Sequence, residues 1–354
     1  MATKFSYVKI MNEREVFSPQ KEIGKFTIQR MIGQGGFGDI YGVKDNDTSQ
    51  MFAMKCEMNL NRTTGLAHEI RILKSLQGSP MFPRIISIGE NEKCKYFVME
   101  LLGPSISKIR RRNIDQKFPL DIALRIAIEM LRCIRQLHRR GFIHRDIKPG
   151  NFLVRPDLVY PICLIDFGLA KSYVDIETGA HLDRMEDCGF VGTSKYASAN
   201  ALRGISLSRR DDLFSWFYSL IELVNGHVPW PDNITDREKC AKIRKAQLSK
   251  SVFQTLSSHF SAIYRKISKL KYDETPDYQA IENILEKMVK ETKTNINTPL
   301  VSQLLSENQI KKIMSFGKER KNSIGNMYET LYSIPSLPKF YDDEPSGCTA
   351  CSIA

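Results

Sequence analysis

Three polar residues close together in the chain could do chemistry as a group. Asp146, Lys148 and Asn151 lie in the sequence His-Arg-Asp-Ile-Lys-Pro-Gly-Asn at residues 144–151, directly before an apolar run. A carboxylate such as Asp146 can accept or orient the proton of a hydroxyl group, and Lys148 can neutralise charge on a phosphate. The amide oxygen of Asn151 suits magnesium. The segment therefore predicts phosphoryl transfer to a hydroxyl.

A second carboxylate, Asp166, follows 20 residues after Asp146, in the sequence Ile-Asp-Phe-Gly at residues 165–168. Carboxylate oxygens are the usual ligands of a magnesium ion that bridges the β- and γ-phosphates of a nucleotide. The tripeptide Asp-Phe-Gly alone is weak evidence of function, but its position after residues 144–151 supports a metal-binding role for Asp166. We expect Asp166 and Asn151 to hold magnesium together.

A glycine-rich segment lies earlier in the chain, Gly-Gln-Gly-Gly-Phe-Gly at residues 33–38. Glycines let a backbone fold closely over phosphate oxygens and offer N–H groups to them. The pattern alone also fits a dinucleotide-binding turn, which should open a helix. Here the following residues, 39–43, have the pattern of a strand. A hairpin that covers a nucleotide is therefore the better interpretation.

One lysine stands in an apolar strand-like segment, residues 52–58, and a helix-like segment with Glu69 follows it. An ammonium group such as that of Lys55 is costly to bury unless it is paired. Glu69 is a suitable partner. Each residue alone would more often be a solvated surface group, so the pairing is a hypothesis that depends on the other motifs.

Patterning divides the chain into a strand-rich and a helical part. Residues 26–32, 52–58 and 96–100 predict strands, and residues 66–76 predict one helix among them. Apolar residues then recur at helical spacing in three later segments. We expect an N-terminal extension at 1–23, a domain at 24–315 with its small part at about 24–100 and its large part at about 104–315, and a tail at 316–354. The three later helical segments are residues 123–137, 212–224 and 281–289.

The four motifs, in their order along the chain, resemble the signature set of the protein kinases. The resemblance implies an α+β, bilobal fold: a small N-lobe with an antiparallel sheet plus one helix, and a large, mainly helical C-lobe. It also implies ATP and Mg²⁺ as cofactors, with Asp146 and Lys148 catalytic and Asn151 and Asp166 as metal ligands. The residues expected to bind ATP are Gly33, Gly35, Gly36, Gly38, Lys55, Glu69, Met99, Glu100 and Leu102.

Later segments narrow the resemblance. Most protein kinases carry Ala-Pro-Glu where residues 198–200 read Ser-Ala-Asn, which resembles the casein kinase 1 superfamily. Residues 99–104 resemble the hinge of that group, with Met99 as gatekeeper. Residues 215–230 look closest to the tau-tubulin kinase branch.

The resemblance also implies the substrate. Lys148 matches the serine/threonine pattern, and the family favours protein substrates with acidic or phosphorylated segments. Lys195 and Lys239 stand where the family binds a substrate anion. A lysine lacks the flat, bidentate guanidinium of arginine, so phosphate selectivity would be weaker. The alternative, two exposed lysines on a basic protein, stays open.

The chain has 354 residues and a formal net charge of +12, which favours acidic partners or simply keeps the protein soluble. No signal peptide, apolar membrane span or nucleic-acid-binding motif is recognisable, so we expect a cytoplasmic or nuclear protein without a specific nucleic-acid partner. We also expect a monomer. The C-terminal Cys-Ser-Ile-Ala fits farnesylation of Cys351, and Cys348 could take a second acyl chain. These lipids would associate the protein with a membrane. The alternative is a tail in which both cysteines are exposed and unmodified.

The competing hypotheses are a pseudokinase scaffold, a basic nucleic-acid-binding protein and a Rossmann dehydrogenase. Pseudokinases usually lack the lysine or one of the two aspartates, whereas Lys55, Asp146 and Asp166 are all present. The net charge permits nucleic-acid binding, but no motif supports it. A dehydrogenase does not account for residues 144–151.

Overall fold

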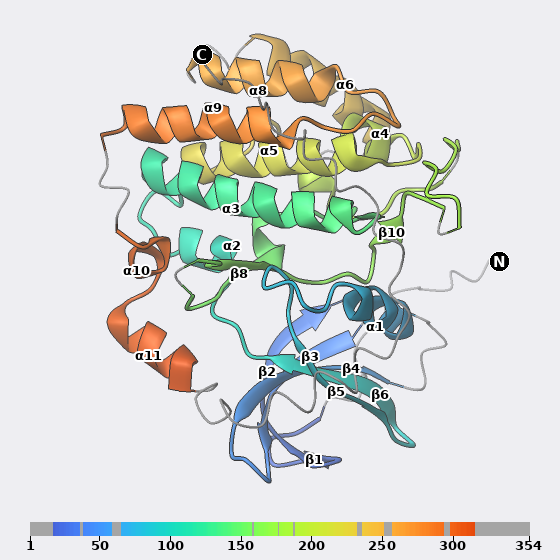
Figure 1. Cartoon of the computed structure of the whole chain (residues 1–354), viewed down its shortest axis with the longest axis vertical. Coiled ribbons are helices and arrows are strands. Elements are labelled where there is room, and N and C mark those ends of the chain that lie inside the picture. Colours follow the sequence, from blue (N-terminus) through green and yellow to red (C-terminus); the bar gives the residue numbers. More distant parts are fainter. Residues whose placement is uncertain are drawn as a thin grey trace, which may run out of the picture.

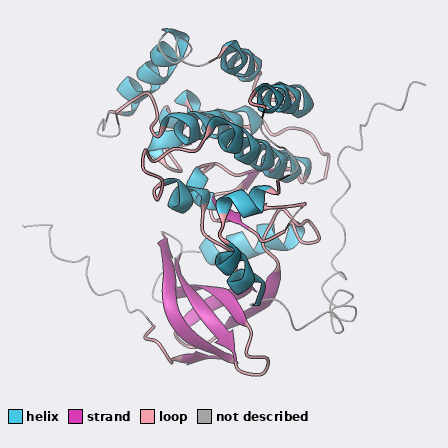
Figure 2. Ribbon diagram, turned by 90° about the vertical axis from the view of Figure 1, so that its left-hand side faces the viewer, coloured by secondary structure: helices cyan, strands magenta, loops and turns pink. Residues whose placement is uncertain are grey.

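The computed structural model describes residues 17–35, 38–58, 65–157, 159–175, 177–186, 188–231, 236–250, 257–293 and 298–315. A twisted sheet with one helix forms one end of the molecule, and a stack of helices forms the other (Figure 1). A view turned by 90° shows the strand-rich part and the helical part next to each other (Figure 2). The predicted α+β, bilobal kinase fold is confirmed.

The N-lobe is built on a six-stranded antiparallel sheet with the strand order β1-β2-β3-β4-β6-β5. β4 is buried along nearly its whole length, because one face of the sheet packs towards α1 (Gly65–Ser75) and the other forms a separate apolar cluster. This burial explains the apolar sequence around Lys55. The strands are β1 (Glu22–Ile23), β2 (Phe26–Gly35), β3 (Gly38–Asp45), β4 (Met51–Met58), β5 (Ile85–Glu90) and β6 (Cys94–Glu100).

The C-lobe is mainly helical, and α3 and α5 form its centre (Figure 1). α3 buries one stripe of apolar side chains, as its 3.6-residue spacing predicts. α5 is buried on most sides and ends at Gly226, whose φ of 86° suits a glycine. The helices are α2 (Ile106–Arg110), α3 (Leu120–Arg139), α4 (Ala199–Leu202), α5 (Arg209–Asn225), α6 (Arg237–Lys250), α8 (Ser258–Ser268), α9 (Tyr278–Glu291), α10 (Leu300–Leu304) and α11 (Glu307–Ser315).

Two small antiparallel sheets of two strands each lie in the part of the chain between α3 and α4. β8 (Phe152–Val154) pairs with β9 (Ile162–Leu164), and β7 (Phe142–Ile143) pairs with β10 (Lys171–Ser172). Residues 144–151 therefore lie between β7 and β8, and residues 165–168 follow β9. Within the described ranges, no helix is both long and apolar enough to cross a membrane.

Candidate active site

Lys55 lies between two carboxylates from different parts of the fold. Its Nζ is 2.6 Å from Glu69 Oε2 on α1 and 2.9 Å from Asp166 Oδ1 after β9. The side chains of Lys55 and Glu69 are only 4% and 3% exposed, whereas that of Asp166 is 37% exposed. The predicted pairing of Lys55 with Glu69 is confirmed, and the structure adds Asp166 to it.

The ionisation of this group follows from burial and charge. Burial opposes the charged form of Lys55, but the two carboxylates outweigh it and raise the pKa of Lys55 well above its usual value. Burial likewise opposes ionisation of Asp166, yet Lys55 lowers the pKa of Asp166 below its usual value. Lys55 is therefore a cation and Asp166 a carboxylate at neutral pH.

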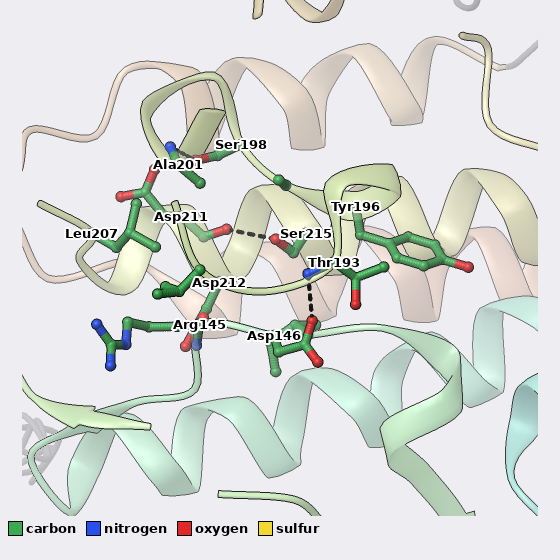
Figure 3. A pocket seen from close by; sticks show the side chains of 13 residues that line it. Arg145, Asp146, Thr193, Tyr196, Ser198, Ala201, Leu207, Asp211, Asp212 and Ser215 are labelled. Atoms are coloured by element: carbon green, nitrogen blue, oxygen red, sulfur yellow. Dashed lines mark hydrogen bonds between the residues drawn. The ribbon is translucent and has the colours of Figure 1, made fainter. Parts of the chain in front are cut away.

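Residues 144–151 bring the other predicted groups together. Lys148 Nζ is 2.6 Å from Asp146 Oδ2 and 2.9 Å from Thr193 Oγ1. The amide nitrogen of Asn151 donates to the Asp146 carbonyl oxygen at 2.9 Å. The backbone N–H of Thr193 donates to Asp146 Oδ1 at 2.8 Å (Figure 3). Both carboxylate oxygens of Asp146 are thus held, and Thr193 joins a site in which the sequence had not placed it.

Asp212 of α5 supports the turn that carries Asp146. Its carboxylate accepts from the backbone N–H of His144 at 2.7 Å and of Arg145 at 2.9 Å. His138 Nε2 lies 2.9 Å from the same carboxylate. Arg145 has a φ of 68°, in the left-handed region, so these two hydrogen bonds hold a backbone conformation that a non-glycine residue seldom adopts.

Phe167 determines where Asp166 points. Its ring is fully buried, 5.5 Å from the His144 ring and 5.7 Å from the Phe82 ring, measured between centroids. Asp166 itself has a φ of 69°. With Phe167 packed inwards, this left-handed residue turns its carboxylate towards Lys55 and the cleft.

The glycine-rich segment forms the predicted hairpin between β2 and β3. Gly33 pairs with Ile40, and Gly35 pairs with Gly38 across the two strands. Gly38 has a φ of 142°, and a Cβ there would collide with the carbonyl oxygen of Cys56, so the close approach of β3 to β4 requires a glycine. Gly36 lies outside the described residues.

The predicted hinge residues end β6 and lead into the C-lobe. Met99 lines one small pocket together with Lys55, Glu69 and Asp166, as a gatekeeper residue should. Glu100 directs its carboxylate to Arg155 in the C-lobe and to the backbone N–H of Arg84. Its side chain therefore joins the two lobes. Leu102 follows in the connection to α2.

The predicted anion-binding lysines have different surroundings. Lys195, in the 3₁₀ turn Ser194–Tyr196, places its Nζ 3.0 Å from Glu222 Oε1, and its side chain is 27% exposed. The fully buried Glu222 also accepts from Arg110 Nη2 at 3.0 Å and from the Tyr196 hydroxyl at 2.7 Å. Lys239 is exposed on α6. Lys195 is thus part of a buried ionic network as well as a surface residue.

The Ser-Ala-Asn sequence at residues 198–200 is anchored on α5. The Ser198 hydroxyl donates to Asp211 Oδ1 at 2.7 Å, and the Asn200 amide donates to the same oxygen at 2.9 Å. Asp211 and Ser198 line one small pocket with Asp146 and Thr193 (Figure 3). This anchoring ties the segment after Thr193 to the helix that also carries Asp212.

A comparison with protein-family models matches residues 26–315 to the protein kinase domain. The match includes every motif described above. This chain belongs to the protein kinase domain family. It is similar to a probable serine/threonine-protein kinase of Dictyostelium discoideum, with 34% identity over 278 residues, which are 78% of this chain and 56% of that relative. The chain thus spans about half the length of that relative.

The donor chemistry of the site fits the nucleotide and metal that protein kinase domains use, ATP and Mg²⁺. Asp166 and Asn151 would supply hard oxygen donors to a magnesium ion, which would neutralise phosphate charge there. Among the described residues, no three His, Cys, Asp or Glu side chains form a self-sufficient metal cage. The predicted lipidation candidates Cys348 and Cys351 lie outside the described residues.

Sequence reasoning missed the residues that support the site rather than line it. Thr193, His138 and Glu222 belong to no short motif and reach the site only through the packing of the C-lobe. Asp212 begins the predicted helical segment 212–224, but no motif marked it as a functional residue. An acidic pair at the start of a strongly apolar helix is the one signal that could have suggested a buried role for it.

Proposed function

We propose that this chain is a serine/threonine protein kinase that transfers the γ-phosphoryl group of ATP to hydroxyl groups of protein substrates. The observation that carries the proposal is the position of Lys55 Nζ, 2.6 Å from Glu69 and 2.9 Å from Asp166. A scaffold that had lost catalysis would not need a buried lysine held between two carboxyl groups, one of which is partly exposed.

Each role follows from this arrangement. Lys55 binds phosphate oxygens, and Glu69 keeps it in place. Asp166 and Asn151 hold magnesium, which when bound neutralises phosphate charge. Asp146 orients the acceptor hydroxyl and accepts its proton, while Lys148 neutralises charge near the transferred group. The Gly33, Gly35 and Gly38 backbone covers the nucleotide, beside the hinge residues Met99, Glu100 and Leu102.

The serine/threonine specificity rests on Lys148 and on the printed description of the Dictyostelium relative. A hydrogen bond from Lys148 to Thr193 Oγ1 at 2.9 Å links residues 144–151, the catalytic loop, to residues 193–198, which we propose receive the substrate and call the substrate segment.

The finer assignments are also proposals. The Ser-Ala-Asn anchor on Asp211 supports membership of the casein kinase 1 superfamily, and residues 215–230 support its tau-tubulin kinase branch. The net charge of +12 and the exposed Lys239 support acidic or phosphorylated substrates. Lys195, being paired with Glu222, would contribute less than Lys239. Charge reversal at both lysines should lower the rate on primed peptides, and an unchanged rate would contradict this preference.

Cytoplasmic localisation, a monomeric state and membrane association through Cys351 and Cys348 stay predictions from the sequence. Mass spectrometry of the native C-terminal peptide tests the lipid. An unmodified, intact Cys-Ser-Ile-Ala end would exclude farnesylation.

The central test compares wild type with Asp166→Asn in phosphate transfer from ATP and magnesium to casein. The amide keeps the shape of the side chain but removes the charge that binds metal, so turnover should fall by at least about 100-fold. Asp157→Asn, in the loop between β8 and β9, is the matched control and should retain full activity, because the asparagine oxygen can still accept from the Val159 and Tyr160 N–H groups. No turnover in the wild type, with ATP still bound, would contradict the proposal and favour a pseudokinase scaffold.

A further inference from the structure

Arg244 of α6 is buried beneath the segment that follows Thr193. It is only 3% exposed. Its Nη2 lies 2.8 Å from the Ser194 carbonyl oxygen and 3.4 Å from that of Lys195, and its Nε lies 3.4 Å from that of Ala197. One guanidinium group thus donates to three carbonyls within four consecutive residues.

Trp230 completes this anchor from the other side. Its indole N–H donates to the Lys195 carbonyl oxygen at 3.0 Å. The Arg244 guanidinium carbon lies 3.8 Å from the centroid of the Trp230 ring, which makes a close cation–π contact. The Tyr218 ring of α5 packs edge-on against Trp230 with centroids 4.7 Å apart. Arg244 and Trp230 therefore form one rigid support that is itself packed on the central helix.

The segment that they support begins at the catalytic loop. The Thr193 N–H donates to Asp146 Oδ1 at 2.8 Å, and Lys148 binds the Thr193 hydroxyl. Gly192, directly before, has a φ of 93°, and a Cβ there would lie 2.5 Å from the Arg145 carbonyl oxygen. The chain thus approaches the catalytic loop closely at residues 192–193 and reaches Arg244 one residue later.

A different contact anchors the residues directly after this segment. Residues 198–200 read Ser-Ala-Asn, where most protein kinases carry Ala-Pro-Glu. Ser198 and Asn200 instead bind Asp211 of α5. The carbonyls of Ser194, Lys195 and Ala197 are held separately, by the N–H groups of Arg244. The planar, multi-donor guanidinium can bind all three, which a lysine could do only in part.

We propose that Arg244 is a positioning residue for substrate: with Trp230 it holds the main chain of residues 194–197, and so sets where a protein substrate lies relative to Asp146. The proposal rests on the kinase activity proposed above. It concerns binding of the protein substrate and not of ATP, because the Arg244 guanidinium donates to carbonyls of residues 194–197, which belong to the substrate segment and not to the Lys55–Glu69–Asp166 group.

Kinetics with casein and ATP test this directly. Arg244→Met keeps most of the side-chain length but removes every donor. We expect the KM for casein to rise about tenfold or more while the KM for ATP stays within about twofold, since the lost interactions act on one substrate only. Arg244→Lys should give an intermediate KM for casein. Lys242→Met removes one charge from the solvent-facing side of the same helix and is the matched control, with both KM values unchanged.

Hydrogen exchange gives a readout that does not depend on activity. The amides of residues 193–198 should exchange faster in Arg244→Met than in wild type and Lys242→Met, with the circular dichroism spectrum unchanged. A fall in kcat with an unchanged KM for casein would overturn the proposal, because it would mean fewer folded molecules and not a displaced segment. If the wild type lacks turnover, the proposed kinase activity is wrong. Hydrogen exchange still tests the anchoring in that case, and unchanged exchange at residues 193–198 in Arg244→Met would overturn it.

Discussion

Glu222 offers the sharpest test of how the C-lobe holds its substrate segment. Its carboxylate is fully buried and accepts from Arg110, Lys195 and the hydroxyl of Tyr196. Glu222→Gln keeps the side-chain volume, so no cavity forms. It removes only the negative charge, which leaves the 7% exposed Arg110 without its counter-ion. The effect on stability is then almost purely electrostatic.

Breaking a buried ion pair by removing one partner costs about 3–5 kcal/mol. We expect a value of about 3 kcal/mol here, because the glutamine oxygen can still accept from Arg110 and its NH₂ can donate to the oxygen of Tyr196. At roughly 2–4 °C per kcal/mol, the thermal midpoint should fall by on the order of 10 °C.

Urea unfolding followed by circular dichroism measures this loss, with Glu238→Gln, whose carboxylate pairs with Arg203 on the surface, as the control that should not change the midpoint. The double variant Arg110→Met/Glu222→Met should lose less than the sum of the two single variants, by about 1 kcal/mol or more. Additive losses, or a Glu222→Gln variant as stable as wild type, would refute the reasoning.

Three further predictions concern the site and its support. Glu69→Gln should lower kcat/KM by roughly 10- to 100-fold, because Lys55 loses one charge-assisted hydrogen bond, and a smaller loss in a casein assay would show that Asp166 alone keeps Lys55 in place. Burial between Asp212 and Tyr278 lowers the pKa of His138 below 6.5, so the folded chain keeps it neutral while the unfolded chain binds a proton. The free energy of unfolding should therefore fall as the pH drops below about 6.5, until the folded-state pKa is reached, and urea midpoints at pH 7.5 and 5.5 should differ less in His138→Gln than in wild type. Gly192→Ala should reduce turnover without preventing ATP binding, since a side chain there collides with the catalytic loop; full activity would mean that residues 192–193 can move aside.

The reactive groups were readable from the chain because their chemistry is local. Asp146, Lys148 and Asn151 lie within the short segment 146–151, and Asp166 follows after the short β8–β9 hairpin. Residue type and spacing therefore nearly determine the geometry of these groups. The helices α3 and α5 were predictable for a similar reason, because apolar spacing and glycine ends are properties of short segments.

The support of the site depends on contacts between distant segments, which no local pattern encodes. Glu222 meets Arg110 across 112 residues, and Arg244 meets the Ser194 carbonyl across 50. The sequence suggested Lys195 as an anion-binding residue for the substrate, yet the packing of α5 against the substrate segment pairs it with Glu222. Which charges are exposed and which are neutralised is decided by how the helices pack, because burial, and not residue type, sets the strength of an ion pair.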